Sequence, residues 1–237
     1  MVKSGHQPAT LQPRERLSEA RVVAAAVALA DAHGFDSLSM RNLADQLGVV
    51  PMALYKHVAN KEALLDGMID VVFAEITFSM DSDWKGALRD RAMAMRDALL
   101  RHPWAVGRME SGTPGPANLR HHNAVMECLR AKAKLSFPAA VHAYNVMDSY
   151  VYGFALQEKT LAPDIPAEAE RRTEIVVEEH PAPLEEYPYL MDVATELAKS
   201  GYDFAEEFEF GLDLVLDGID RFRRAELSKA PPRRRKR

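Results

Sequence analysis

The stretch MRNLADQLGVVPMALYKHVANK, residues 40–61, decides how the N-terminal part of the chain folds. Two short apolar patterns flank Gly48, and a proline, an aromatic residue and several basic side chains follow it. Two short helices joined by a turn that contains glycine form a helix-turn-helix. We predict that its interior is filled by small or apolar side chains, namely Leu43, Ala44, Leu47, Val49, Leu54 and Val58.

The ends of the predicted helices are marked by residues that favour capping. Ser39 can accept a hydrogen bond from a backbone amide of the first helical turn. Gly48 suits the left-handed conformation that ends a helix, and Pro51 fits the first position of the next one. Asn60 is expected to cap a longer helix over residues 61–80.

With Leu54 and Val58 turned inward, the helix that starts at Pro51 presents a polar, aromatic and basic face. A recognition helix in the DNA major groove reads base edges with its N-terminal residues, and flanking groups bind phosphate. The first three residues of this helix are therefore candidates for apolar contacts with bases. Tyr55, His57 and Lys61 are candidates for phosphate contacts, and Arg41 and Lys56 could contact either a base or a phosphate. The predicted DNA-binding residues are Ser39, Met40, Arg41, Pro51, Met52, Ala53, Tyr55, Lys56, His57 and Lys61.

Charge is distributed unevenly along the 237 residues, whose net charge is −5. Residues 1–61 hold seven Lys/Arg and five Asp/Glu, residues 62–220 hold fourteen and twenty-nine, and residues 221–237 hold nine and one. Because phosphate binding depends on local Lys and Arg, DNA is expected to meet the basic ends and not the acidic body. The final PPRRRKR predicts a disordered basic tail, which either adds non-specific DNA affinity or serves only solubility.

Beyond Trp84, apolar residues recur three and four positions apart without strand-like alternation, which predicts an all-α fold. The segment 161–187 is rich in Pro, Glu and Ala and is predicted to be a long mobile loop. Helices are expected over residues 84–101, 104–110, 117–134, 138–160, 188–200 and 203–225. The predicted parts are a disordered extension (1–13), a three-helix helix-turn-helix domain (14–60), a connecting helix (61–80), a larger helical regulatory and dimerisation domain (81–225) and the tail (226–237).

The segment LSMRNLADQLGVVPMALYKHVANKEALLDGM resembles the DNA-binding domain of the tetracycline-repressor (TetR) family. The later segments ALLRHPWAV, YVYGFALQE and FEFGLDLVLDGID are similar to the regulatory domain of the subgroup that contains the tetracycline repressor itself. The resemblance implies an all-helical homodimer that binds a palindromic operator as a repressor. It also implies release of the operator when a small molecule fills the larger domain.

The sequence departs from the tetracycline-binding members at the site of the drug's magnesium ion. A histidine in the sixth helix holds that ion in those members, and an ungapped match places Met109 there. Because a thioether replaces imidazole or oxygen ligands poorly for a hard cation, we expect no magnesium–tetracycline complex as effector. No metal and no cofactor are predicted.

Methionine and aromatic residues on the helices of the larger domain predict an adaptable apolar pocket, although core packing explains most of them individually. We expect an apolar or aromatic effector bound chiefly by shape, with a few polar anchors such as Arg91, Asn123 or Asp148. The predicted ligand-binding residues are Thr77, Arg91, Met95, Trp104, Met109, Asn123, Met126, Tyr144, Met147 and Asp148.

Two apolar stripes, on residues 138–160 and 203–225, predict either packing inside one subunit or pairing with the same helices of a second copy. Gly211 and Gly218 lie seven residues apart, hence on one face, and would permit close approach of helices. The family resemblance favours the dimer. The predicted interface residues are Val151, Phe154, Phe208, Gly211, Val215, Gly218, Ile219 and Phe222.

The alternative class is a helical enzyme that processes a small molecule, with the basic N-terminal face only a solvated surface. His121, His122 and Glu127 lack the spacing of a metal-binding motif, and GTPGP at 112–116 lacks the lysine of a phosphate loop, so we predict no enzyme. The single Cys128 is expected to be inert core. No apolar run reaches the roughly 18 residues needed to span a bilayer, and the start lacks an apolar signal, so a cytoplasmic protein without a membrane partner is expected.

Overall fold

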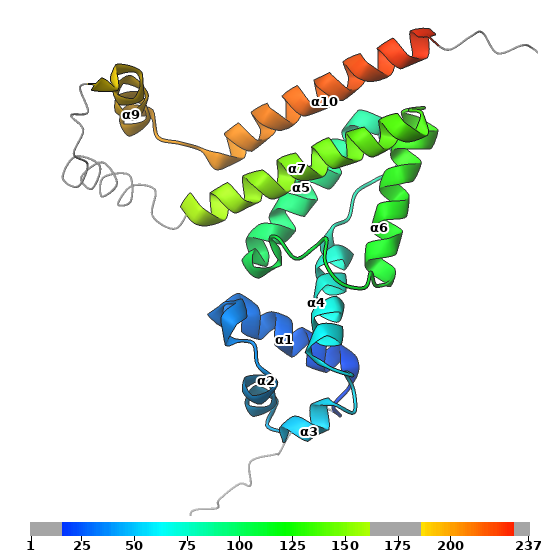
Figure 1. Ribbon diagram of the computed structural model, residues 1–237, viewed down its shortest axis with the longest axis vertical. Coiled ribbons are helices and arrows are strands. Elements are labelled where there is room, and N and C mark those ends of the chain that lie inside the picture. The colour runs from blue at the N-terminus through cyan, green and yellow to red at the C-terminus, as the bar shows by residue number, and fades with distance from the viewer. Residues whose placement is uncertain (1–15, 162–185, 230–237) are drawn as a thin grey trace, which may run out of the picture. The chain divides into compact units, whose positions relative to one another are not determined.

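The computed structural model describes residues 16–161 and 186–229, which contain helices and no strand (Figure 1). The predicted all-α class is confirmed for these ranges. The chain divides into two compact units, and the division falls between Leu64 and Leu65. The predicted extension at 1–13, residues 162–185 of the predicted loop and residues 230–237 of the predicted tail lie outside the described residues.

The first unit is a small bundle of short helices. Its elements are α1 (Glu19–His33), the 3-10 turn η1 (Phe35–Ser37), α2 (Met40–Leu47), α3 (Pro51–Leu54) and the start of α4 (Lys61–Glu75). Helix α2 packs against both α1 and α3, and the helix-turn-helix layout is therefore present.

The capping residues of this unit act as the sequence predicts. The hydroxyl oxygen of Ser39 accepts a hydrogen bond from the Asn42 amide at 3.1 Å, and the Asn60 side chain accepts one from the Ala63 amide at 2.7 Å. Gly48 ends α2 in the left-handed conformation, with φ at 66°. Local side chains thus set the start of α2 and of α4, and Gly48 sets the turn between α2 and α3.

The second unit contains the remainder of α4 and the longer helices. They are α5 (Trp84–Arg101), the 3-10 turn η2 (Pro103–Ala105), α6 (Pro116–Glu127), the π-helical turn η3 (Cys128–Lys132), α7 (Phe137–Leu161), α9 (Pro188–Ser200) and α10 (Phe204–Lys229). Helix α7 packs against both α5 and α10 (Figure 1). None of the described helices is long and apolar enough to cross a membrane.

A buried ion pair fixes α5 against α7. The Arg96 guanidinium donates two hydrogen bonds to the Glu158 carboxylate, at 2.8 and 2.6 Å. The same guanidinium lies 5.2 Å from the centre of the Phe208 ring on α10. Since the two-pronged geometry of arginine fits one carboxylate orientation, this contact fixes the register of the three helices.

Two predicted helix boundaries are wrong. Helix α4 ends at Glu75 and not near residue 80. Beyond it, the Ser79 hydroxyl accepts a hydrogen bond from the Asp81 amide at 3.0 Å, a local contact that competes with helical hydrogen bonds in this segment. The predicted helix over 104–110 is the single turn η2 followed by further turns, since Gly107 adopts a left-handed φ of 81°.

At the C-terminal side the predicted helices are close to those observed. The predicted helix over 117–134 is divided into α6 and the wider turn η3, in which the Ala133 amide donates to the Cys128 carbonyl at 2.9 Å. Helix α10 starts after Asp203, whose carboxylate accepts a hydrogen bond from the Ala205 amide, and it continues to Lys229. Residues 226–229 are therefore helical and do not belong to a disordered tail.

Candidate functional site

The segment that contains α3 buries some of its side chains and exposes others, as the predicted DNA contact requires. Leu54 and Val58 are buried inside the first unit, with exposed fractions of 0% and 5%. Met52 is 72% exposed and Tyr55 is 47% exposed, although both are large side chains with apolar surface. Lys56 beside them is also exposed. An apolar and basic surface with no partner in the described chain suits a groove lined by thymine methyls and phosphates.

The other predicted DNA-binding residues occupy several environments. Pro51 and Arg41 are exposed, and Ala53 and His57 are half-buried. Ser39 and Met40 are half-buried at the start of α2, where the Ser39 side chain is occupied as a cap.

Lys61 has a structural contact that the sequence does not indicate. Its ammonium donates a hydrogen bond to the Leu38 carbonyl at 2.9 Å and lies 5.7 Å from the centre of the Phe35 ring. An ammonium carries three N–H donors, so this contact leaves Lys61 capable of binding a phosphate. Its role as a phosphate ligand stays a prediction.

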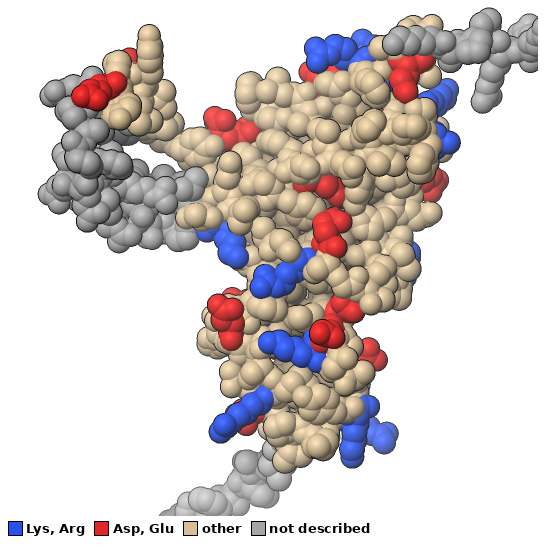
Figure 2. All heavy atoms as spheres, in the orientation of Figure 1, with Lys and Arg blue, Asp and Glu red and all other residues tan. Residues whose placement is uncertain are grey.

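Val50 is a candidate that the sequence reasoning missed. It is 67% exposed and immediately precedes α3, next to Pro51. Its position immediately before a helix that starts with proline is the feature of the sequence that could have indicated it as a DNA-binding residue. Figure 2 shows exposed Lys and Arg side chains on the N-terminal unit, in the lower part of the view.

The second unit contains a buried polar cluster, which we define as Arg91, His121, His122, Tyr144 and Asp148. Arg91 on α5 is fully buried, and it donates hydrogen bonds to Asp148 on α7 at 2.5 Å and to His121 on α6 at 3.1 Å. The Tyr144 hydroxyl lies 2.9 Å from Nδ1 of His122. The structure thus brings three predicted ligand residues together, namely Arg91, Tyr144 and Asp148.

The environment of the polar cluster determines its protonation. Burial, together with the positive charge of Arg91, lowers the pKa of His121 to about 3, so that this imidazole is neutral at pH 7. Burial also raises the pKa of the Tyr144 hydroxyl, and the nearby Asp148 carboxylate raises it further. From the sequence, His121 and His122 were considered only as metal ligands and were missed as members of this cluster.

The remaining predicted ligand residues divide between the interior and the surface. Met95, Trp104, Met109 and Met147 are buried. Thr77 is exposed in the segment after α4. A shallow hollow on α6 is lined by Asn123, Met126, His122, Leu119 and Arg120.

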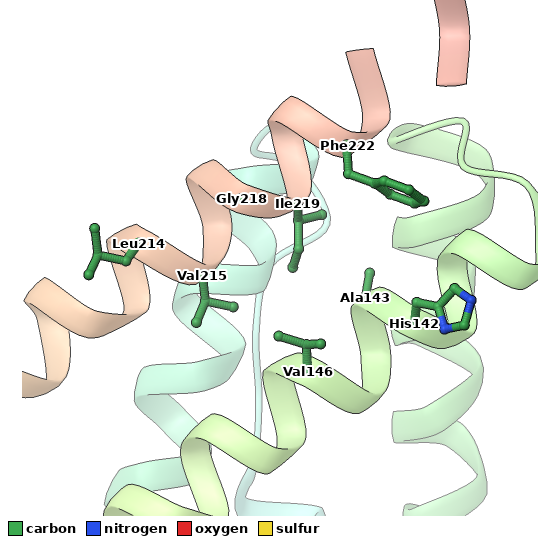
Figure 3. Close-up of a pocket in the computed structure, with 8 residues that line it drawn as sticks. All are labelled: His142, Ala143, Val146, Leu214, Val215, Gly218, Ile219 and Phe222. Atoms are coloured by element: carbon green, nitrogen blue, oxygen red, sulfur yellow. The ribbon is translucent and has the colours of Figure 1, made fainter. Parts of the chain in front are cut away.

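A groove lies between α7 and α10 (Figure 3). It has a volume of about 330 Å³ and is almost entirely apolar, with Val146, Leu214 and Phe222 about half exposed. Three predicted interface residues besides Phe222 line it, namely Val215, Gly218 and Ile219.

Other predicted interface residues need correction. Val151 and Phe208 have no exposed surface, and Phe154 packs against Phe208 with ring centres 5.2 Å apart, so these side chains belong to the interior of one chain. Gly211 faces the same chain, because a Cβ added there would overlap the side chain of Tyr150. The predicted stripe on α10 is apolar, but residues one helical turn apart on it have different environments: Gly211 faces Tyr150 of the same chain, whereas Val215 lines the groove.

Cys128 lies in the interior of the second unit. Cys128 is buried and its thiol donates to the Trp84 carbonyl, and burial raises its pKa to about 11, as expected for an inert core residue. No group of three His, Cys, Asp or Glu side chains within residues 16–161 and 186–229 could hold a metal ion.

Comparisons with known proteins match both units. Residues 22–68 match the family of bacterial regulatory proteins named tetR, and residues 79–223 match the tetracyclin repressor-like C-terminal domain. The chain is 34% identical over 223 residues to the HTH-type transcriptional repressor DrrR1 of Streptomyces coeruleorubidus, covering 88% of this chain and 79% of that protein. It is 32% identical to the tetracycline repressor protein class G of Vibrio anguillarum, covering 90% and 98%.

The fold is also similar to solved structures. The crystal structure of the Streptomyces coelicolor TetR family protein ActR in complex with actinorhodin is 25% identical and has a TM-score of 0.72. That similarity covers 86% of this chain and 96% of the other.

Proposed function

Because the chain belongs to the TetR family of bacterial transcriptional regulators, we propose that it is a repressor that binds a palindromic DNA operator as a homodimer and leaves it when a small molecule binds. The observation that carries this proposal is the face of α3, where Met52, Tyr55 and Lys56 are exposed while Leu54 is buried. Such a protein acts in the cytoplasm, where the chromosome lies.

The proposed contacts with DNA follow from the exposure of each residue. Pro51, Met52 and Ala53 contact base edges, and Tyr55 and Lys56 bind phosphates together with Lys61. Two copies of α3 related by a two-fold axis read half-sites one helical turn apart, about 34 Å, which makes the operator palindromic.

The proposed dimer forms through the groove between α7 and α10. A groove with half-exposed Val146, Leu214 and Phe222 is costly to leave in water, and two copies can cover it by packing the same surface against itself. Gly218 has open space around it, which leaves room for a partner helix to approach closely.

The proposed effector is an apolar or aromatic small molecule bound in the second unit. The structure of the related ActR has been solved in complex with actinorhodin, and another relative is named a tetracycline repressor. Met109 at the expected metal-binding position argues against a magnesium complex in this chain. Release of DNA requires that the effector prefers the conformation that does not bind DNA, since equal affinity for both conformations changes nothing.

Helix α4 is proposed as the connector between binding and release. It is one continuous helix across the division between the two units. A displacement at one end of a rigid helix is transmitted to the other end, so a ligand bound in the second unit can change the position of the first.

The test is to select an operator from a random duplex library with the full chain and then to screen compounds for its release. Replacement of Lys56 by Gln should weaken binding to every duplex and lower the salt dependence by about one unit of slope, since one phosphate contact is lost. Lys199→Gln, an exposed lysine on α9 of the second unit, is the matched control and should change neither quantity. Binding that is independent of salt would contradict the proposal.

The enzyme alternative makes a different prediction for the same surface. If the basic face is only solvated, Arg41→Gln and Tyr55→Ala leave DNA binding unchanged in a folded protein. The proposed repressor loses operator affinity in both variants, while its thermal unfolding stays the same because both residues are exposed.

A further inference from the structure

The ion pair between Arg91 and Asp148 leaves one donor group and one acceptor atom unused. The Nε group of Arg91 donates a hydrogen bond to His121, and its Nη1 group donates one to Oδ1 of Asp148. Its Nη2 and the Oδ2 of Asp148 are buried and have no hydrogen-bond partner within the described chain. Both side chains are more than nine-tenths buried.

This arrangement differs from the usual two-pronged pairing of arginine with a carboxylate. In that pairing both oxygens are satisfied by one guanidinium, as Arg96 and Glu158 show on the same helices α5 and α7. At Arg91 the Nε group donates to His121 and not to the carboxylate, so Asp148 accepts only one hydrogen bond from this guanidinium. Buried polar atoms are rarely left unpaired in native proteins, so a partner is expected for Nη2 and for Oδ2.

No positive charge is left over around these two atoms. The positive charge of Arg91 faces the negative charge of Asp148, and His121 beside them is neutral. The Glu110 carboxylate adds a further negative charge near His122 and Tyr144. An anionic ligand would have to bury its charge next to the Asp148 carboxylate without a spare cation, which is unfavourable.

The surroundings of the pair are aromatic. The Phe73 ring centre lies 5.3 Å from that of His121 and 5.3 Å from that of His122, and the His122 and Tyr144 ring centres are 5.6 Å apart. The guanidinium of Arg91 lies 5.8 Å from the centre of the Tyr144 ring. His122 also lines the hollow on the surface of α6, so this side chain connects the surface with the polar cluster.

We propose that Arg91 and Asp148 together anchor an uncharged aromatic effector that carries a hydrogen-bond acceptor next to a donor. Its acceptor, such as a carbonyl oxygen, binds the Nη2 group of Arg91, and its neighbouring N–H or O–H donates to Oδ2 of Asp148. The inference rests on the proposed effector-controlled function and names the chemical class that this site takes.

Three probes of nearly equal shape separate this class from the others. 2-Naphthamide presents an acceptor and a donor, methyl 2-naphthoate presents acceptors only, and 2-naphthoate is an anion with acceptors only. Their dissociation constants for the full chain are measured at pH 7 by calorimetry or ligand-observed NMR. The amide should bind at least about tenfold more tightly than either of the others, since a wrong partner leaves a buried group unpaired.

The variant Asp148→Asn tests the assignment of the acceptor. The carbonyl of the introduced asparagine can still accept from Arg91, but an amide N–H₂ takes the place of Oδ2, and the negative charge is lost. The preference should therefore reverse, so that 2-naphthoate binds more tightly than 2-naphthamide. Asp97→Asn, on the exposed side of α5, is the matched control and should retain the preference for the amide.

The measurements on the unmodified chain decide the proposal even if the Asp148→Asn variant does not fold. Equal affinity for the three probes, tighter binding of the anion, or no binding of any probe at about millimolar concentration would each overturn it. Operator binding is measured separately with the same preparation. Loss of the amide preference with intact operator binding rejects this inference alone, whereas failure to bind any operator rejects the proposed function.

Discussion

Met52 and Leu54 lie two positions apart in α3 and have opposite environments. Leu54 is fully buried and Met52 is 72% exposed. Leu54→Ala should lower the free energy of unfolding by about 2–5 kcal/mol, because it leaves a cavity in the first unit. Met52→Ala should change that free energy by less than about 0.5 kcal/mol but alter the base preference. Urea unfolding and selection from a random duplex library measure the two effects, and an unchanged base preference in Met52→Ala would count against the assigned base contact.

His121 should make the stability of the chain depend on pH. Its pKa is about 3 in the folded chain, because of burial and of Arg91, and about 6.5 when unfolded. The unfolded chain therefore binds a proton below pH 6.5 that the folded chain does not, and stability is complete above pH 6.5 and is lost as the pH falls toward 3. This group alone contributes a slope of up to about 1.4 kcal/mol per pH unit.

His121→Gln removes this titration but keeps an acceptor for Nε of Arg91. Between pH 6.5 and 4.5 its melting temperature should fall less steeply than that of the unmodified chain. His33→Gln, an exposed histidine at the end of α1, is the control and should keep the original slope. Parallel curves for His121→Gln and the unmodified chain would show that His121 is not held neutral by burial.

At the residue scale, contacts between residues that are close in the sequence could be predicted. Ser39, Gly48 and Asn60 were identified because each acts on backbone groups within a few residues of itself. The pairing of Arg91 with Asp148 spans 57 residues, and no local pattern indicates it. Arg91 and Asp148 were therefore predicted only as separate polar anchors, and His121 was missed as their neighbour.

At the scale of elements, long periodic helices were predicted well and their ends less so. The predicted helix over 188–200 has the observed bounds of α9. The predicted helix over 104–110 failed, because Gly107 permits a left-handed turn that the apolar spacing does not reveal. The division of the apolar stripes between core and groove could not be predicted either, since it depends on how α7 and α10 pack.

Helix α6 depends on a side chain of α4 for its first turn. Its N-cap is Gly115, which has no side chain, and Oδ1 of Asp70 accepts a hydrogen bond from the Asn118 amide at 2.8 Å in its place. Asp70→Ala should therefore lower the free energy of unfolding of the chain by about 1 kcal/mol, the usual value of a lost cap. Chemical denaturation measures this change, with Asp97→Ala, an exposed aspartate on α5, as the control. Equal stability of Asp70→Ala and the control would show that the contact does not stabilise α6.

The whole molecule depends on the proposed pairing of two chains through the groove between α7 and α10. Leu214→Asp places a charge on its exposed rim, where Leu214 is 61% exposed. Burial of an unpaired carboxylate opposes association, so this variant should sediment as a monomer at concentrations where the unmodified chain is a dimer. Leu100→Asp, which changes a 37% exposed side chain on α5, should remain dimeric. A dimeric Leu214→Asp variant would place the interface elsewhere.

In the proposed repressor, the full chain recognises a DNA sequence through α3. The proposed roles of the dimer and of the effector both depend on this recognition. The most direct measurement is the ratio of its dissociation constants for a scrambled duplex and for the duplex selected from a random library, at about 150 mM salt. We predict a ratio of at least about 10³, typical of specific DNA-binding proteins, and its reduction when Met52 and Ala53 are both changed. Equal dissociation constants for the two duplexes would contradict the account.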